Sequence, residues 1–185
     1  MPIITPLANV DADLIDQVLD RAFGADRHAR TAYRIREGAD WLQALSFAVL
    51  DDHEYLGGTI QLWPVALTTP EGASHPLIMV GPVAVLPEYQ NGGYGKALMA
   101  ASLGALDATQ ALPQIMIGDP EYYGRFFGFA AQATAGWRCP GPVDANRLLV
   151  RCDNPAILPR EGMLGPWPQD VNRRVNDDTE GATGD

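Results

Sequence analysis

The chain has 185 residues, 46% of them hydrophobic, and its formal net charge at pH 7 is -10. This length and apolar fraction suit one domain with its own core. The acidic charge would repel a phosphate backbone, so we expect no nucleic-acid partner. The sequence has no apolar run of roughly 18 residues, the minimum for a membrane-spanning helix, so we expect no membrane association and a cytoplasmic protein.

The chain is predicted to fold as one domain over residues 1–170. Residues 171–185 are polar and acidic and lack an apolar periodicity, which predicts a flexible tail. Cys139 and Cys152 are too few for a disulfide framework and stand outside metal-ligand spacings, so both are expected to be free thiols. His28 and His75 are isolated in sequence, so we predict no metal site.

The first half of the chain predicts one short strand, two helices and three longer strands. The strand is MPIIT, and Asn9 or Asp11 can then cap an amphipathic helix that Gly24 ends. A second, more charged helix is expected over residues 28–36. The next three apolar segments are separated by turn residues and are expected to form an antiparallel meander. They are LSFAVL, DDHEYLGGTIQLWPVAL and HPLIMVGPVAVL.

The second half alternates helices with short strands. A helix is expected over about residues 93–108, followed by the strand QIMI. Asp119 can cap a further helix with Pro120 in its first position, and Gly128 would end that helix. RLLVRC reads as a late strand. This order of elements favours an α/β or α+β fold in which helices cover a sheet.

The most informative stretch is VLPEYQNGGYGKALMAA, in which a Gly-rich corner joins a strand to a helix. Such a corner presents unpaired backbone N–H groups and the positive end of the helix dipole, so it favours an anion such as phosphate. A Walker A loop would need glycine at Gln90 and Ser or Thr at Ala97. A dinucleotide fingerprint beginning at Gly93 would need glycine at Leu98. Both nucleotide motifs therefore fail.

The residues from Gln90 to Gly95 fit the pattern [RQ]-x-x-G-x-[GA] and resemble the acetyl-CoA loop of the GNAT superfamily of N-acetyltransferases. In that family the loop cradles the pyrophosphate of acetyl-CoA. Weaker similarity to a branch of bacterial predicted acetyltransferases extends from Ile3 to about Arg151. The resemblance implies a mixed, largely antiparallel sheet with helices on both faces and a fourth strand that splays from its neighbour.

The fourth strand corresponds to GPVAVLPEYQ, and Pro82 within it predicts a local break in pairing because proline removes a ladder donor. In the family, the pantetheine arm lies in the resulting gap and pairs with free backbone groups of the strand. The resemblance thus implies ten cofactor-binding residues: Val83, Ala84, Val85, Gln90, Asn91, Gly92, Gly93, Tyr94, Gly95 and Lys96.

The segment GDPEYYGRFFGF resembles the last part of the family's catalytic core, where a tyrosine precedes a Gly-Phe pair. A phenol with a pKa of about 10 can protonate a departing thiolate at neutral pH. The resemblance implies Tyr123 for this role. However, Tyr123 precedes Gly128 by one residue more than the usual spacing, so Tyr122 remains an alternative, as does a packing role for both rings.

The implied activity is transfer of an acetyl group from acetyl-CoA to a primary amine by direct attack, with no metal. The amine needs a base or a water chain, and Glu88, Glu37, Asp51 and His53 are candidates by residue type. A cysteine nucleophile is disfavoured because nothing indicates a lowered pKa.

Two other functions stay open, a non-catalytic acyl-CoA sensor or pseudoenzyme and a nucleotide-binding module. The acceptor could be a small molecule or a peptide amine, and the acidic field would attract a cation. Tyr33, Arg34 and Trp63 are candidates to line its site. A homodimer is also left open.

Overall fold

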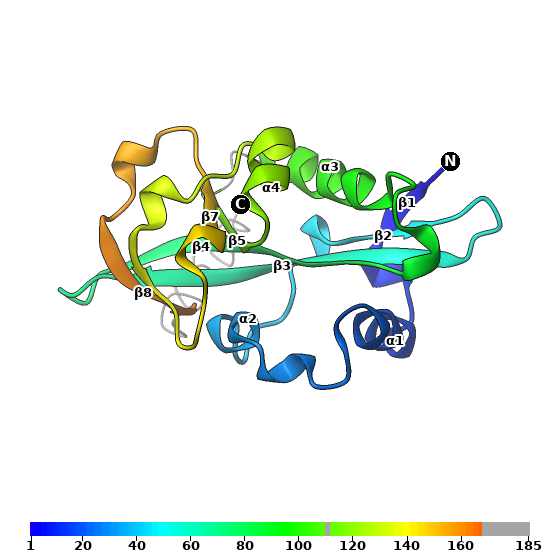
Figure 1. Cartoon of the computed structure of the whole chain (residues 1–185), viewed down its shortest axis with the longest axis horizontal. Coiled ribbons are helices and arrows are strands. Elements are labelled where there is room, and N and C mark those ends of the chain that lie inside the picture. Colours follow the sequence, from blue (N-terminus) through cyan, green and yellow to red (C-terminus); the bar gives the residue numbers. More distant parts are fainter. Residues whose placement is uncertain (110–111, 168–185) are drawn as a thin grey trace, which may run out of the picture.

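Three consecutive strands form the antiparallel meander that the sequence predicts. They are β2 (Phe47–Leu50), β3 (Leu56–Thr68) and β4 (Ser74–Val85). The strand β1 (Ile3–Pro6) pairs with β2 at the edge. The computed structural model describes residues 1–109 and 112–167, so the predicted tail at 171–185 lies outside the described residues. Within them, the strands form one eight-stranded sheet (Figure 1).

The rest of the sheet is built by short strands from the second half of the chain. The strand β5 (Gln114–Ile117) joins β4 in parallel, and β7 (Leu148–Arg151) pairs with β5. The strands β6 (Gly136–Arg138) and β8 (Glu161–Pro166) were not predicted, since neither shows a clear alternation of apolar and polar residues. The strand β8 pairs with the end of β3 that extends beyond β2, and β6 pairs with β8.

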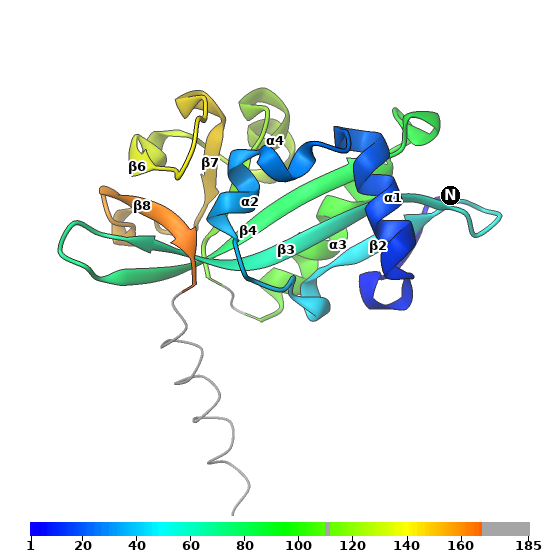
Figure 2. The same ribbon diagram turned by 90° about the horizontal axis from the view of Figure 1, so that it is seen from below.

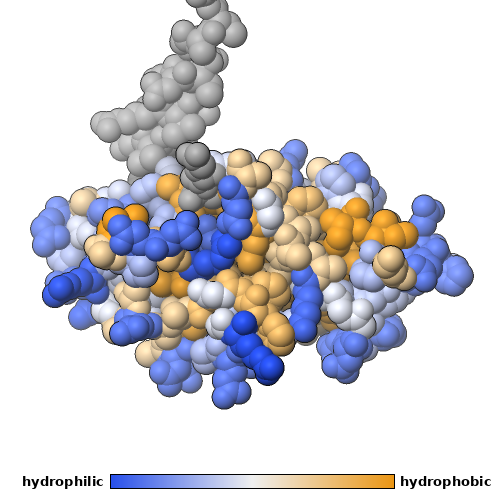
Figure 3. Space-filling view, turned by 90° about the horizontal axis from the view of Figure 1, so that it is seen from above, coloured by the Kyte–Doolittle hydropathy of each residue, from blue (hydrophilic) through white to orange (hydrophobic). Residues whose placement is uncertain are grey.

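In the described residues, four α-helices cover the two faces of the sheet, and helices on both faces were predicted. Figures 1 and 2 show α1 (Ala12–Phe23) and α2 (Thr31–Ile35) on one face, and α3 (Tyr94–Asp107) and α4 (Pro120–Phe127) on the other. Figure 3 shows the face that carries α3 and α4, where hydrophobic patches are separated by hydrophilic residues. In the described part of the chain, no helix has both the length and the hydropathy needed to cross a membrane.

The helix ends follow local sequence signals. The Asp11 carboxylate accepts a hydrogen bond from the backbone N–H of Asp13 at 2.8 Å, and Gly24 follows the last residue of α1. Gly93 (φ 80°) precedes α3 in the left-handed conformation, and Gly128 (φ 77°) ends α4 in the same conformation. The helix predicted over residues 28–36 is wrong in extent, because Arg30 is extended and separates a 3₁₀ turn from α2.

The strand β4 separates from β5 halfway along its length, which confirms the predicted splay. The two strands pair only through Ile78 with Gln114 and Met79 with Ile115. Just beyond this point, the register between β3 and β4 shifts opposite Gly81 and Pro82, so the predicted break in pairing is also present. From Val80 onward, β4 has no strand partner on its β5 side among the described residues. The sheet therefore opens between these strands.

Apolar side chains fill both faces around this opening. One cluster packs α3 and α4 against the sheet and includes Val80, Leu98 and Met116. On the other face, Leu19 of α1 packs in a cluster with Ala84, and Ile35 of α2 packs in another with Met79. Because the middle of β4 is packed from both sides, its splayed end is held in place.

Candidate active site

A cavity of about 770 Å³ occupies the opening between β4 and β5. It is lined from both faces of the sheet, because side chains of α2 and of α4 meet at the gap between the strands. Its wall includes Tyr33, Arg36, Val80–Val83, Met116–Gly118, Tyr122 and Tyr123. The size and the mixed lining of this cavity suit a small-molecule site.

A second cavity, of about 510 Å³, lies over the Gly-rich corner at the start of α3. The residues of the predicted cofactor site that line it are Val85, Gln90, Asn91, Gly93, Tyr94, Gly95 and Lys96. Of the other three predicted residues, Val83 lines the larger cavity. The Ala84 side chain is buried in the cluster beneath α1, and Gly92 packs against the Tyr94 ring.

The corner leaves backbone donors available. Ala97 donates its N–H to the carbonyl of Gly93 at 3.0 Å. In the described part of the chain, the N–H groups of Tyr94, Gly95 and Lys96 have no hydrogen-bond acceptor. These donors lie at the positive end of the helix dipole. The arrangement can therefore hold an anion, and phosphate is the group most often found at such a terminus.

The helix α4 places two tyrosines between the cavities. Asp119 caps the helix by accepting a hydrogen bond from the N–H of Glu121 at 3.1 Å, and Pro120 takes the first helical position. The ring of Tyr122 lines both cavities, whereas that of Tyr123 lines only the larger one. The two rings are perpendicular, with centroids 4.9 Å apart. The structure thus brings both predicted tyrosines to the cavity at the splay.

Both phenols lie in surroundings that keep them protonated. Burial raises the pKa of Tyr122 and that of Tyr123, and nearby Tyr122 and Asp119 raise the pKa of Tyr123 further, against a lowering by Arg147. The ring of Tyr123 packs so closely on Gly118 that a Cβ there would lie 2.7 Å from it. A protonated phenol at this position can donate a proton to a group bound in the cavity.

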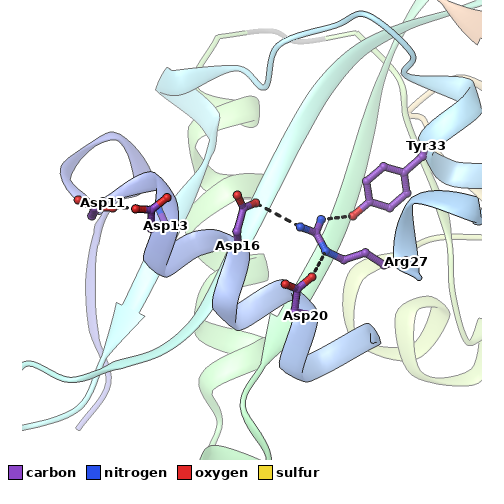
Figure 4. Close-up of polar contacts among 6 residues, drawn as sticks. All are labelled: Asp11, Asp13, Asp16, Asp20, Arg27 and Tyr33. Carbon is purple, nitrogen blue, oxygen red and sulfur yellow. Dashed lines mark hydrogen bonds and ion pairs between the residues drawn. The ribbon is translucent and has the colours of Figure 1, made fainter. Parts of the chain in front are cut away.

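The opposite wall is organised by a buried arginine. Arg27 donates to the carboxylate of Asp20 at 2.9 Å, to that of Asp16 at 3.2 Å and to the Tyr33 hydroxyl at 2.6 Å (Figure 4). Both aspartates come from α1, so the network ties α1 to the segment that leads into α2. The charge of Arg27 is paired with these carboxylates. Its hydrogen bond to the Tyr33 hydroxyl holds the Tyr33 ring at the cavity wall.

A second arginine, Arg36, is buried in the same wall with only 4% of its surface exposed. Its guanidinium carbon lies 4.2 Å from the ring centroid of Tyr33 and 4.0 Å from that of Trp63. One N–H group donates to the carbonyl of Gly81 at 3.2 Å. Burial lowers the pKa of Arg36 to about 10, so the side chain remains charged at neutral pH.

Comparison with known proteins decides the family. Residues 4–131 match the model of the acetyltransferase (GNAT) domain, which is more than half of the chain. The chain belongs to the GNAT family. A comparison with proteins of curated function finds no match.

Solved structures of GNAT proteins resemble this one. A GNAT family N-acetyltransferase from Escherichia coli (YhbS), solved in complex with CoA, is 26% identical, with a TM-score of 0.70 over 93% of this chain and 92% of that chain. A GNAT family acetyltransferase from Brucella melitensis, solved in complex with acetyl-CoA, is 25% identical, with a TM-score of 0.54 over 83% of this chain and 97% of that chain. The predicted family and fold are therefore confirmed.

The base candidates taken from residue type lie away from the larger cavity of this GNAT protein. Glu88 pairs with Arg21, and Asp51 accepts hydrogen bonds from the Tyr89 hydroxyl and from two backbone N–H groups. Neither Glu37 nor His53 lines the cavity. Its described walls instead contain the carboxylates of Asp119 and Asp144, which the sequence analysis did not propose as bases.

The three residues predicted to line the acceptor site have different positions in this GNAT protein. Tyr33 lines the cavity, Arg34 is exposed and donates to the carbonyl of Pro140, and Trp63 lies behind Arg36. Arg36 itself was missed, although it stands at the end of the helix predicted over residues 28–36. Its role depends on burial, which a short charged segment does not reveal. The described residues contain no cluster of three or more potential metal ligands.

Proposed function

We propose that this GNAT protein transfers the acetyl group of acetyl-CoA to a primary amine by direct attack within a ternary complex. The observation that carries the proposal is the junction of the two cavities at Tyr122, which lines both. A donor with its phosphates at the Gly-rich corner would place its thioester in the splay. An acceptor would then enter from the side of α2.

On the donor side, the free N–H groups of Tyr94, Gly95 and Lys96 would bind the pyrophosphate, and the Lys96 ammonium would add a positive charge. The pantetheine arm would run along the splayed end of β4, past Val83 and Val85. Its amides can pair with that strand edge, which lacks a β5 partner among the described residues. The CoA and acetyl-CoA complexes of the similar E. coli and Brucella proteins support this assignment.

The chemistry would proceed without a covalent enzyme intermediate. A neutral amine attacks the thioester carbonyl, and backbone N–H groups of the splayed strand would stabilise the tetrahedral oxyanion. The C–S bond then breaks, the nitrogen loses a proton, and the CoA thiolate receives one. We assign this proton donation to Tyr123, with Tyr122 as the alternative, because both residues line the cavity and burial raises the pKa of both phenols.

The test combines binding with turnover. Equilibrium binding of acetyl-CoA, ADP and NADH to the full chain should show a clear preference for acetyl-CoA. Release of free thiol from acetyl-CoA should then depend on an added primary amine from a panel of amino acids, polyamines, aminoglycosides and peptides. Thiol release without amine measures background hydrolysis.

The outcomes separate the competing functions. Amine-dependent thiol release with formation of the N-acetyl product supports the proposed enzyme. Tight acetyl-CoA binding without turnover of any amine would identify a non-catalytic sensor. A preference for ADP or NADH would identify a nucleotide-binding module.

A further inference from the structure

The charged residues that line the larger cavity are mostly arginines, whereas the whole chain is acidic. Four arginines line it, Arg27, Arg30, Arg36 and Arg147, against two aspartates, Asp119 and Asp144. The protein as a whole has a net charge of -10. The composition of the whole chain would attract a cationic acceptor, but arginines outnumber aspartates among the residues that line this cavity. The acceptor therefore has to suit positive charge at the wall.

Most of these charges already have partners or reach solvent. Arg27 is paired with Asp16 and Asp20 of α1. The carboxylates of Asp119 and Asp144 each accept a hydrogen bond from a backbone N–H two residues later in the chain. Arg30 and Arg147 are exposed, so water can solvate them. Arg36 is therefore the exception that needs an explanation.

Arg36 combines burial with unused donors. No carboxylate of the described residues pairs with its guanidinium within 4.0 Å, and its hydrogen-bond partners there are the Gly81 carbonyl and the Tyr33 hydroxyl. A guanidinium has five N–H donors, so most of them lack a protein partner. A buried charge without a counter-ion is costly, and proteins keep such groups paired or use them to bind a ligand. Arg36 is one of the residues that line the cavity.

The stacking around Arg36 orients the guanidinium before any ligand arrives. The rings of Tyr33 and Trp63 both lie within 4.2 Å of its central carbon, and Arg27 holds the Tyr33 hydroxyl. A planar guanidinium held in this way presents paired N–H donors that match the two oxygens of a carboxylate. A phosphoryl group, with nearly two negative charges and three oxygens, would need further donors.

We propose that the acceptor is an amine that also carries a carboxylate, and that Arg36 binds this carboxylate in the cavity. The inference rests on the proposed function and specifies its substrate class. Apolar wall residues such as Met79, Ile117 and Val143 suit an acceptor with an aliphatic or aromatic body.

The experiment compares matched amines on the unaltered protein. Leucine, methionine and phenylalanine are each paired with their primary amides, which keep the amine and remove the carboxylate charge. We expect kcat/KM to be about 100-fold or more higher for the acid, the size expected when a buried charge loses its partner. Arg36→Gln and Arg36→Lys should reduce this preference toward unity. Arg34 is exposed and lies in α2, two residues before Arg36, so Arg34→Gln should leave the preference unchanged.

Binding provides a readout that does not need turnover. In the presence of saturating CoA, calorimetry measures the affinity of the N-acetyl forms of the same amino acids and of their amides. The acids should bind about 100-fold more tightly, and Arg36→Lys should remove most of this difference. Acetyl-CoA binding by each variant reports that the fold is intact.

Two outcomes would overturn the inference. One is equal or better turnover and binding of the amides by the unaltered protein, and the other is no binding of either set. Failure of the proposed function looks different. In that case no amine would release thiol, while calorimetry could still show the carboxylate preference of Arg36.

Discussion

At the scale of single residues, two neighbouring tyrosines have different surroundings. Tyr123 is packed against Gly118 and faces only the larger cavity, whereas Tyr122 stands between the cavities. Successive helical residues are turned by about 100°, yet both tyrosines line the cavity at the splay. Position alone does not tell which tyrosine donates the proton, so the rates of variants have to be compared.

Replacing Tyr123 by phenylalanine should remove the proton and keep the ring. We expect acetyl-CoA binding to persist and the chemical step to slow by about 100-fold to 10,000-fold, the usual range for general acid catalysis. Tyr122→Phe should have a smaller effect. Single-turnover rates on one amine compare the two variants. A large loss confined to Tyr122→Phe would transfer the role to Tyr122, and full activity in both variants would assign the proton to water or to another group.

The protonation of Tyr123 can be measured directly. Burial disfavours the phenolate, so its pKa should lie above the reference value of about 10, and the neutral donor form should persist throughout the neutral range. The difference between the tyrosinate absorbance titrations of the wild type and Tyr123→Phe isolates this phenol. A midpoint within or below the neutral range would contradict the assignment, because a phenolate cannot donate a proton.

At the scale of elements, the corner before α3 and the splay of β4 depend on specific backbone features. Gly93 has a positive φ that side chains rarely tolerate, and the register shift beside Pro82 lets β4 leave β5. The start of the corner is also anchored by Tyr89, whose hydroxyl donates a hydrogen bond to the Asp51 carboxylate at 2.8 Å. A change to the corner's surface should therefore be testable without unfolding it.

Gly95→Val should weaken acetyl-CoA binding by about 10-fold to 100-fold, the size of one or two hydrogen bonds to a charged group. A Cβ at Gly95 would make an ordinary 3.7 Å contact with Val85, so the helix should still form while the added methyl groups enter the smaller cavity. Calorimetry measures the affinity.

The matched control is Gly104→Val, at an exposed position of the same helix with open space around it. It makes the same change in helix propensity and should bind acetyl-CoA as the parent does. Equal affinities of the two variants would show that the corner does not hold the phosphates. Gly93→Val is less informative, because the positive φ of Gly93 would strain the loop by itself.

At the scale of the whole molecule, the proposed ligand contacts elements from most of the chain. The two cavities together are lined by residues of β4, α3, α4, the end of β5 and the segment around α2. A ligand that occupies them binds the folded state and not the unfolded chain, so it must stabilise the fold by mass action.

Acetyl-CoA at 100 times its dissociation constant should stabilise the protein by about 2.7 kcal/mol. For a chain of this size, this corresponds to a rise in Tm of about 5 to 10 °C. Acetyl-pantetheine at the same concentration, which lacks the phosphates, should produce a much smaller rise. Thermal unfolding followed by circular dichroism makes the comparison. An equal rise with both ligands would mean that the corner contributes little to recognition.

Much of this structure could be predicted from local signals in the sequence. The caps Asp11 and Asp119, the glycines that end α1 and α4, and the meander of β2, β3 and β4 are all present where expected. These features depend on residues that are near one another in the chain. The helix over residues 28–36 was wrong because the extended Arg30 interrupts it, and β6 and β8 were missed because their pairing is set by distant strands.

Local signals in the sequence were enough to predict the Gly-rich corner, the break at Pro82 and two tyrosines near Gly128. The packing of the folded chain was needed to show which side chains share a cavity. It placed Glu88 and Asp51 in other contacts and buried Arg36 between two rings without a carboxylate partner in the described residues. The physical reason is that helix caps and glycine conformations are local properties, whereas burial and charge pairing arise only when residues distant in sequence are packed together.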